Sequence, residues 1–549
     1  GEIGPDLTAF KRDDVHSMTT SIVNPNAEIR EGYEMFIAQL TDGAVHTGFL
    51  AAQDPQRPSW LAIGRSFDRD EVIGLGTGIR DLVRATLVAL LPVYSYIAWN
   101  RDNDHIAMGR ALREHRVAKA RRGLAKNDSV RIIAGLFSGR VGVVQDIDWQ
   151  AIAPPLVLAC TAVVVLLADA FAGPPRTRGQ ALVPAILTVA GIALASVYAV
   201  GAMVANANDG EVRQTFCVEA LLEGPAQCSL VVDRLTLVFW AIVLFGALVV
   251  ALLGTAAVAD GRTPQGEWNF LLLCSATGAM TIAASRDLVT LLVALEVVSL
   301  PAFAMVGLRR GDRRAAEASV KFFLVSVVAT AVTLMGISFV YGATGSVFLN
   351  QVDVAVTTGI GPREVAVVGA LLTVVGLAFK VAAVPFHMWV PDTYVGAPVA
   401  VAAYLSVVSK AAGFVGLLLV LSHGLPDLAG AWSPVMAVIA ALTMTVGNVV
   451  ALWQQHAVRL LAWSSVAQAG YILVPFGAVA AASREEISAV LSRSTGYLAM
   501  YAVVNLCAFG VAAVVGTRYP AQRLADYRGL IREEPLAGWA LAFALVALA

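Results

Sequence analysis

Three charged side chains lie inside long apolar segments of the sequence. Glu296 lies in LVTLLVALEVVSLPAF, Lys380 in LLTVVGLAFKVAAVPF and Lys410 in VAAYLSVVSKAAGFVG. An ionised side chain at the centre of a bilayer costs at least about 2.5–3.5 kcal/mol, so it needs a partner, a water-filled path or a function. Desolvation favours the neutral form of both residue types, whereas a nearby opposite charge favours the charged form. A lysine that gains and loses a glutamate partner can therefore bind and release a proton, which predicts a proton relay.

A fourth charge, Lys321, lies near the start of the apolar segment ASVKFFLVSVV and is the least certain member of this relay. It follows Glu317 by one helical turn, so an i,i+4 pair or extension to the membrane surface is the alternative. Glu296, Lys380 and Lys410 lie too deep for such extension. For them the alternative is a purely structural buried ion pair.

The segment that carries Lys380 also contains a helix-breaking residue. Pro385 lies five residues after Lys380 and removes a backbone donor, which kinks or ends a helix. Discontinuous helices at membrane depth line polar cavities and place helix ends against ions. The alternative is a plain proline-capped helix end followed by an interfacial Trp389. His387 is then either a relay group or an interfacial histidine.

The composition indicates that a membrane bundle positions these side chains. Hydrophobic residues make up 57% of the 549 residues and charged residues only 14%, against roughly a quarter charged in soluble proteins. This excludes a disordered chain, a coiled coil and an ordinary soluble enzyme, and a net charge of -1 gives no indication of nucleic acid. The first 149 residues contain 37 charged residues, but the remaining 400 contain only 42, so the membrane part begins near Asp148–Trp149.

A helix needs roughly 20 apolar residues to cross the hydrocarbon core. Continuous rather than alternating apolar runs favour helices over a β-barrel. The sequence predicts eleven complete spans, at 150–172, 181–205, 231–258, 268–285, 287–308, 318–343, 364–386, 397–421, 433–453, 458–480 and 491–516. A twelfth begins near Leu536 and is cut off, and no signal peptide precedes the polar start, so we expect a fragment open at both ends.

Arginines predict the orientation of the spans. They gather in the links after the first, fifth and eleventh spans, which we therefore place on the cytoplasmic side. The acidic link 206–230 then faces outward, where Cys217 and Cys228 form either a disulfide or two free thiols. Five widely spaced cysteines, and histidines without the spacing of haem ligands, give no cofactor motif. We expect no redox chemistry on this chain.

Four strings of the membrane part resemble the N-type antiporter-like subunit of bacterial respiratory complex I, equivalent to mitochondrial chain 2. They are GLAFKVAAVPFHMWVPDTYVGAPVAVAAYLSVVSK at 376–410, LEVVSLPAFAMVGLRRGDRRAAEASVKFF at 295–323, GNVVALWQQHAVRLLAWSSVAQAGYILV at 447–474 and ADYRGL at 525–530. The resemblance covers about 148–549. It implies an all-α polytopic antiporter-like bundle of fourteen helices with a broken seventh helix, here truncated in the twelfth.

The resemblance also implies a function. Such subunits help to move protons while NADH reduces quinone, in the bacterial inner membrane and in contact with lipid and other membrane subunits of complex I. NADH, FMN, iron–sulfur clusters and quinone are expected on other subunits, and no nucleic acid is expected. Glu296 matches the family's essential glutamate, Lys380 the lysine of the broken helix, Lys410 the central lysine and Lys321 a sixth-helix lysine of less certain role. Gln468 stands where a relay histidine is common, so the relay there must use water or another group.

Residues 1–147 form a small soluble α+β or β extension of doubtful origin. Residues 4–54 resemble the tail of a c-type cytochrome domain, and a hairpin with Asp42–Gly43 at its turn is the alternative. Residues 128–147 resemble a KOW element, and the basic run 113–126 either touches RNA or anionic lipid or forms a solvated face. The apolar run 85–99 is too short for a span, so we expect a buried or interfacial helix. These pieces imply different compartments, which favours a chimeric reading frame.

Three functions compete for the membrane part. The first is proton translocation within NADH:quinone oxidoreductase. The second is an independent Mrp-type cation/proton antiporter subunit built on the same plan. The third is a non-conducting subunit that only bridges its neighbours.

Overall fold

The computed structural model describes residues 147–172, 178–218, 227–258, 263–519 and 522–548, together with five short strands before them. The chain divides into two compact units, 1–105 and 106–549. In the first, strand β2 (Val45–Ala52) pairs antiparallel with β1 (Met35–Gln39) and β3 (Ser59–Ala62), so the strands of the hairpin named as the alternative are present. The predicted turn at Asp42–Gly43 lies outside the described residues. The cytochrome-like stretch outside these strands, the apolar run 85–99 and the basic run 113–126 lie outside the described residues. The KOW resemblance stays a prediction, with only β4 (Ser129–Arg131) and β5 (Val141–Val143), an antiparallel pair, described there.

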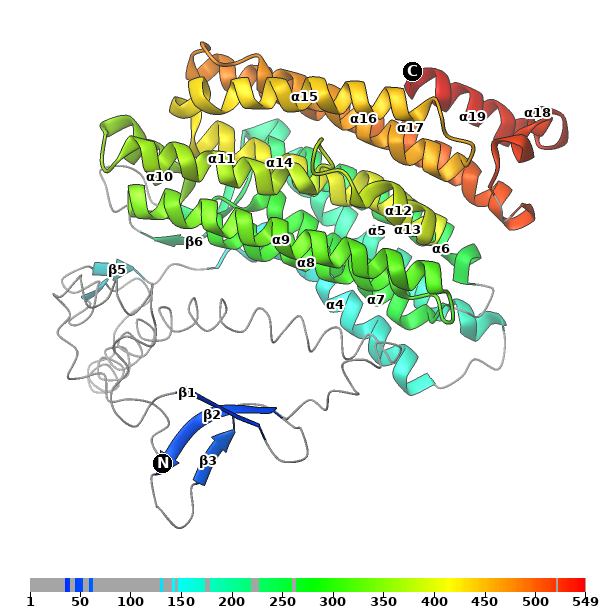
Figure 1. Ribbon diagram of the computed structural model, residues 1–549, viewed down its shortest axis with the longest axis horizontal. Coiled ribbons are helices and arrows are strands. Elements are labelled where there is room, and N and C mark those ends of the chain that lie inside the picture. Colours follow the sequence, from blue (N-terminus) through cyan, green and yellow to red (C-terminus); the bar gives the residue numbers. More distant parts are fainter. Residues whose placement is uncertain are drawn as a thin grey trace. The chain divides into compact units, whose positions relative to one another are not determined.

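From Trp149 onward, the described residues of the second unit form a bundle of helices with one β-hairpin (Figure 1). Every predicted span coincides with a helix, so the prediction of an all-α polytopic protein is confirmed. The helices are α4 (Trp149–Ala172), α5 (Arg178–Asp209), α6 (Arg234–Val258), α7 (Gln265–Ala284), α8 (Leu288–Gly307), α9 (Arg313–Thr344), α10 (Leu349–Thr358), α11 (Arg363–Lys380), α12 (Trp389–Gly396), α13 (Val399–Tyr404), α14 (Lys410–Leu419), α15 (Ala429–Ala451), α16 (Ala457–Gly477), α17 (Arg484–Arg518), α18 (Leu530–Glu533) and α19 (Pro535–Leu548).

Nine helical segments of the described residues are long and apolar enough to cross a membrane. The segment 399–424 is one of them; one π-helical turn joins α13 to α14 within it, and a second follows α14. Helices α7 and α11 occupy the predicted fourth and seventh spans, but they are not among the nine. Helix α10 was not predicted, because its ten residues mix polar and apolar side chains between two spans.

The helices around the charged residues begin at clear capping residues. Asp287 precedes α8, and its carboxylate accepts hydrogen bonds from the backbone N–H groups of Val289 and Thr290. Asp312 caps α9 in the same way. These carboxylates satisfy backbone donors that the first helical turn leaves free. The sequence therefore fixes where the helices that carry Glu296 and Lys321 begin.

Helices α9 and α11 pack with their backbones in direct contact, because glycines face each other across the interface. A Cβ atom on Gly336 of α9 would lie 2.8 Å from the carbonyl oxygen of Gly369. A Cβ atom on Gly369 of α11 would lie equally close to the carbonyl oxygen of Gly336. Gly342, on the exposed side of α9, has no atom within 4 Å of such a position. Small residues at helix interfaces allow this close approach within membranes.

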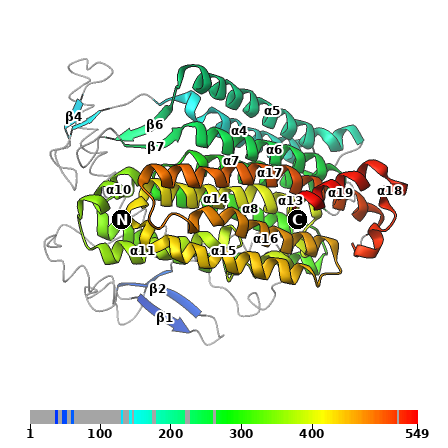
Figure 2. The same cartoon turned by 90° about the horizontal axis from the view of Figure 1, so that it is seen from above.

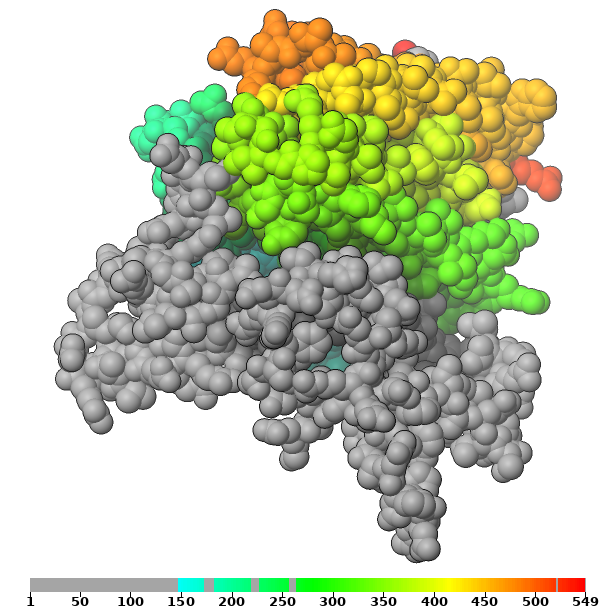
Figure 3. Space-filling view, turned by 60° about the vertical axis from the view of Figure 1, so that its left-hand side comes forward, coloured from blue at the N-terminus to red at the C-terminus, as the bar shows by residue number. Residues whose placement is uncertain are grey.

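The hairpin of β6 (Arg213–Val218) and β7 (Gln227–Val232) lies at the same end of the bundle as α10, and α18 lies at the opposite end (Figure 2). Backbone bridges join Leu230 to Ser285 and Asp287 to Phe348, so the links after α5, α7 and α9 meet there. This is the end that the arginine pattern predicts to face outward. In the view of Figure 3, the surface of α15 to α17, coloured yellow to orange, lies beside that of α10 and α11, coloured lime green.

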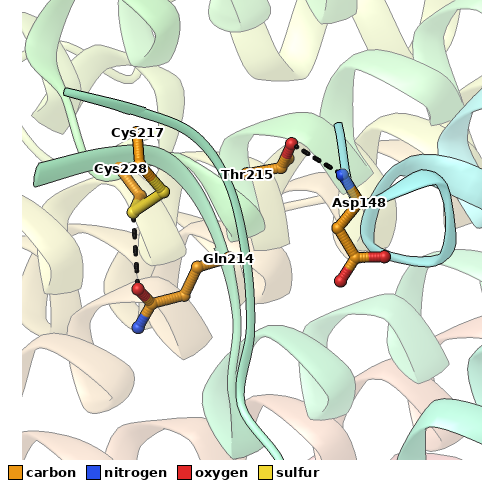
Figure 4. The surroundings of a disulfide bond; sticks show 5 residues. All are labelled: Asp148, Gln214, Thr215, Cys217 and Cys228. Carbon is orange, nitrogen blue, oxygen red and sulfur yellow. Dashed lines mark hydrogen bonds between the residues drawn. A yellow bond between two sulfur atoms is a disulfide. The ribbon is translucent and has the colours of Figure 1, made fainter. Parts of the chain in front are cut away.

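A disulfide joins Cys217 and Cys228, which stand opposite each other in this hairpin (Figure 4). The structure thus resolves the two alternatives in favour of the bond. The backbone N–H of Asp148 donates to the Thr215 hydroxyl at 3.3 Å, which attaches the start of α4 to the hairpin. The described strands of the predicted outer loop therefore form a cross-linked hairpin.

An ion pair also stabilises this end. The guanidinium of Arg286, buried between α7 and α8, lies 2.6 Å from the carboxylate of Asp233. Burial opposes ionisation of Asp233, but the charge of Arg286 and hydrogen bonds from Thr236 and Arg286 outweigh it and hold the pKa of Asp233 below its ordinary value. The carboxylate of Asp233 is therefore charged at neutral pH.

Candidate functional site

Glu296 of α8 and Lys380 of α11 meet in the interior of the bundle. The Lys380 Nζ atom lies 3.8 Å from Glu296 Oε1. The same Nζ donates to the Ser299 hydroxyl at 2.7 Å and to the Ser326 hydroxyl at 2.9 Å. An ammonium group has three donors, and these three oxygens match them in number. The hydroxyl of Thr330 donates to Glu296 Oε1 at 2.7 Å, so the carboxylate has a second partner.

The burial of this pair is uneven. The Lys380 side chain is 10% exposed and the Glu296 side chain 21% exposed. Ser299 and Ser326 are buried as well. Hydrogen bonds to the remaining donors and acceptors make a buried charge pair tolerable, and here they satisfy Lys380 Nζ and Glu296 Oε1. The surroundings can therefore hold the charged forms of both residues.

Helix α11 ends at Lys380, six residues before the predicted end of the seventh span. The backbone N–H of Ala382 bonds to the carbonyl of Phe379, and that of Ala383 to the carbonyl of Ala378. Ala382 has a φ of 64°, in the left-handed region. Together these features are a Schellman motif, the usual helix ending with glycine at the left-handed position. The prediction that the helix runs to residue 386 is wrong, because this motif ends it earlier.

The predicted break around Pro385 is present, between α11 and α12, and neighbouring side chains satisfy its free backbone groups. The Trp389 indole N–H donates to the carbonyl of Phe379 at 3.2 Å. The backbone N–H of Val384 donates to the Thr443 hydroxyl of α15 at 2.9 Å. Irregular backbone at membrane depth requires such partners. Trp389 is therefore buried as part of the break and does not serve as an interfacial residue.

Lys410 begins α14, directly after a π-helical turn, η2 (Leu405–Ser409). Its side chain is fully buried, with 1% of the residue exposed. The Nζ atom donates to the carbonyl and to the hydroxyl of Ser465 on α16, both at 2.6 Å. π-Helical turns occur frequently at functional sites. The sequence predicted an ordinary helix here.

Lys380 and Lys410 lie on neighbouring helices. Gly413 follows Lys410 by three residues, on the same face of α14. A Cβ atom on Gly413 would lie 3.0 Å from Cβ of Lys380 and from a methyl group of Val381. The structure therefore brings the elements of both lysines together, although no hydrogen bond joins the two side chains.

Lys321 lies on the surface, apart from the other residues of the predicted relay. Its Nζ is 2.8 Å from Glu317 and 3.3 Å from Asp392, and half of its side chain is exposed. Arg459 of α16 also approaches Asp392, at 3.7 Å. Asp392 belongs to α12, so this cluster joins the second half of the broken helix to α9 and α16. The i,i+4 pair with Glu317, named as the alternative, is present.

The two remaining candidates lie near the break and near α19. Nδ1 of His387 is buried and has no hydrogen-bond partner among the described residues, and the His387 ring lies 5.2 Å from the ring of Trp463. Gln468 accepts a hydrogen bond from the Tyr497 hydroxyl at 2.6 Å and donates to the carbonyl of Leu548 at 2.7 Å. No hydrogen bond or ion pair of the described residues joins His387 or Gln468 to Glu296, Lys380 or Lys410.

Sequence reasoning missed the hydroxyl groups that surround the charges. Serine and threonine are common in membrane helices, so their identity alone gives no signal. Ser299 was within reach, because it follows Glu296 by three residues and so lies on the same helix face. The others belong to different helices, and only the packing reveals them.

A buried lysine–glutamate pair beside a broken helix, inside a polytopic bundle, is typical of antiporter-like subunits of membrane transport complexes. The family described as "NADH:quinone oxidoreductase/Mrp antiporter, TM" matches residues 285–549. The chain is 53% identical to NADH-quinone oxidoreductase subunit N 2 of Streptomyces griseus over 415 residues, which cover 74% of each chain. It is 46% identical to subunit N of Salinispora tropica, over 74% of this chain and 77% of that one.

A solved structure, respiratory complex I from Thermus thermophilus with bound aureothin, contains a similar chain. The identity is 32%, the TM-score is 0.54, and the match covers 72% of this chain and 78% of the other. The protein belongs to the subunit N family of NADH-quinone oxidoreductase. It is a multi-pass protein of the bacterial inner membrane. The resemblance noted in the sequence is thus confirmed.

Proposed function

We propose that this chain is a membrane subunit of bacterial NADH:quinone oxidoreductase and takes part in proton translocation coupled to electron transfer. Its partners are other membrane subunits of that complex, and the redox cofactors belong to other subunits. The names of the relatives at 53% and 46% identity support this proposal over an Mrp-type antiporter. The single observation that carries it is the buried Lys380–Glu296 pair beside the broken helix.

In this proposal Lys380 binds and releases the proton. When charged, its ammonium group has Glu296 and the two serine hydroxyls as acceptors. When neutral, the amine can keep hydrogen bonds to the hydroxyls, because a serine hydroxyl both donates and accepts. If the carboxylate of Glu296 loses its negative charge, the ammonium form of Lys380 is less stable. The proton would then leave Lys380 toward Lys410 on the adjoining helix. Lys410 would be the next group to hold it.

Substitutions of Lys380 test this proposal in the assembled complex. Lys380→Met removes the titrating group, and Lys380→Arg keeps the positive charge but cannot release a proton. We expect both to reduce proton translocation at least about tenfold, since loss of a proton-transfer group has effects of that order or larger. The measurement compares NADH-driven acidification of proteoliposomes, by a fluorescent pH probe, with quinone reduction and with assembly on native gels.

The arginine variant separates the competing functions. If Lys380→Arg restores wild-type translocation, the pair is only a structural ion pair. If both variants leave translocation unchanged, the chain is a bridging subunit. A sodium gradient across the proteoliposomes that drives proton movement without NADH would indicate the Mrp-type alternative.

A further inference from the structure

Lys410 is a buried cation site without a carboxylate. None of the ion pairs among the described residues includes Lys410, and its hydrogen bonds go to the Ser465 carbonyl and the Ser465 hydroxyl. The Tyr501 hydroxyl of α17 lies 2.8 Å from the Ser465 hydroxyl and 3.2 Å from the carbonyl of Ser406. Lys410, Ser465, Tyr501 and the Ser406 carbonyl therefore form one connected chain of hydrogen-bonding groups.

This chain can satisfy two protonation states of Lys410. When the lysine is charged, Nζ donates to Ser465 Oγ, the Ser465 hydroxyl donates to Tyr501, and Tyr501 donates to the Ser406 carbonyl. When it is neutral, the Ser465 hydroxyl turns to donate to the Nζ lone pair, and Tyr501 donates to Ser465 Oγ. Hydroxyl hydrogens rotate freely. Apart from the proton that Lys410 releases, only two hydroxyl hydrogens move between these states, and no heavy atom has to shift.

Other contacts hold the heavy atoms of this chain in place. The side-chain amide of Asn505, one turn after Tyr501 on α17, donates to the Ser406 hydroxyl at 2.7 Å. That hydroxyl in turn donates to the carbonyl of Ala403. The Tyr501 ring also lies 5.9 Å from Lys410 Nζ, near enough for a favourable interaction with the ammonium form.

We propose that Ser465 and Tyr501 are positioning residues whose hydroxyls reorient together to accommodate both the charged and the neutral form of Lys410. This inference rests on the proposed proton-relay function. It assigns to two side chains the role that a carboxylate plays for Lys380. The pair allows Lys410 to change charge inside the bundle without an ion partner.

Four variants in the assembled complex test the inference. Ser465→Ala deletes a hydroxyl that bonds to the buried lysine, and Tyr501→Phe deletes the hydroxyl that bonds to Ser465. We expect each to slow NADH-driven proton translocation roughly tenfold, since a hydrogen bond to a charged buried group has an effect of that order and Tyr501 acts on that bond through Ser465. Ser465→Thr keeps a hydroxyl and should restore translocation to within about twofold. Lys410→Met shows how much proton translocation is lost when the lysine itself is absent.

Two matched controls delete comparable hydroxyls nearby. Ser494→Ala removes a buried serine hydroxyl that also joins α17 to α16, by donating to the carbonyl of Ile472 at 2.8 Å. Tyr404→Phe removes a buried tyrosine hydroxyl that lies near Ser275 and makes no hydrogen bond to Lys410, Ser465 or Tyr501. We expect both complexes to assemble and to translocate protons like the wild type.

The outcomes separate the inference from the proposed function. If Lys410→Met translocates protons normally, the relay role of Lys410 is wrong and the inference fails with it. If Lys410→Met is inactive but Ser465→Ala and Tyr501→Phe behave as wild type, the relay stands and the inference is overturned. It is also overturned if Ser465→Thr fails to restore the activity, or if Ser494→Ala is equally harmful, because the hydroxyls then serve packing alone.

Discussion

Lys321 and Lys380 both lie beside a carboxylate, but their surroundings predict different roles. Lys321 is half exposed, pairs with Glu317 and shares the carboxylate of Asp392 with Arg459, whereas Lys380 is almost completely buried. Exposed ion pairs contribute about 0–1 kcal/mol. We therefore expect Lys321→Met to retain at least about half of the proton translocation, in contrast to Lys380→Met. The assay is acidification of proteoliposomes by the assembled complex, and a loss equal to that of Lys380→Met would return Lys321 to the relay.

At this scale the sequence predicted the charges but not their partners. Glu296, Lys380 and Lys410 stand out because an ionisable group in an apolar run is costly. Ser465 and Tyr501 carry no such cost, and they lie on helices far from Lys410 in the sequence. Helix packing determines which hydroxyl groups hydrogen-bond to each lysine, and the sequence of a single helix does not predict it.

Among the elements, the end of α11 depends on an alanine where glycine is usual. Ala382 adopts the left-handed conformation and is fully buried. A β-branched residue fits this conformation poorly, so we expect Ala382→Val to lower the stability of the complex by about 2 kcal/mol or more. Ala382→Gly should be nearly neutral, because relief of backbone strain offsets the loss of a buried methyl group. Thermal unfolding of the detergent-solubilised complex measures both, and equal effects of the two substitutions would contradict the explanation.

The absence of a glycine at position 382 also explains why the sequence predicts the end of α11 too late in the chain. Pro385 was the visible signal, and it predicts a helix that ends close to residue 386. The structure ends the helix at Lys380 because Trp389 and Thr443 supply partners for the freed backbone groups. The positions of the spans follow from hydropathy, but a break within a span depends on side chains from other helices.

For the whole molecule, the arginine pattern and the arrangement of the links agree on two distinct ends. Helix α10 lies at the end with the disulfide hairpin, and Arg310 lies in the link between α8 and α9 at the other end. We expect Thr358→Cys on α10 to react with a membrane-impermeant maleimide in right-side-out vesicles. Arg310→Cys should react only in inside-out vesicles. Both side chains are exposed, so labelling reports orientation, and the reverse pattern would overturn the predicted topology.

The glycine contacts between α9 and α11 limit how this molecule can work. Because Gly336 and Gly369 interlock backbone against backbone, neither helix can slide along the other without a collision of main-chain atoms. Ser326 and Lys380 are carried by these two helices, so the spacing between them is a fixed dimension of the scaffold. The scaffold therefore behaves as a rigid frame in this region. The steps that open and close a proton path must then come from motion of the lysine side chains and rotation of the hydroxyl groups.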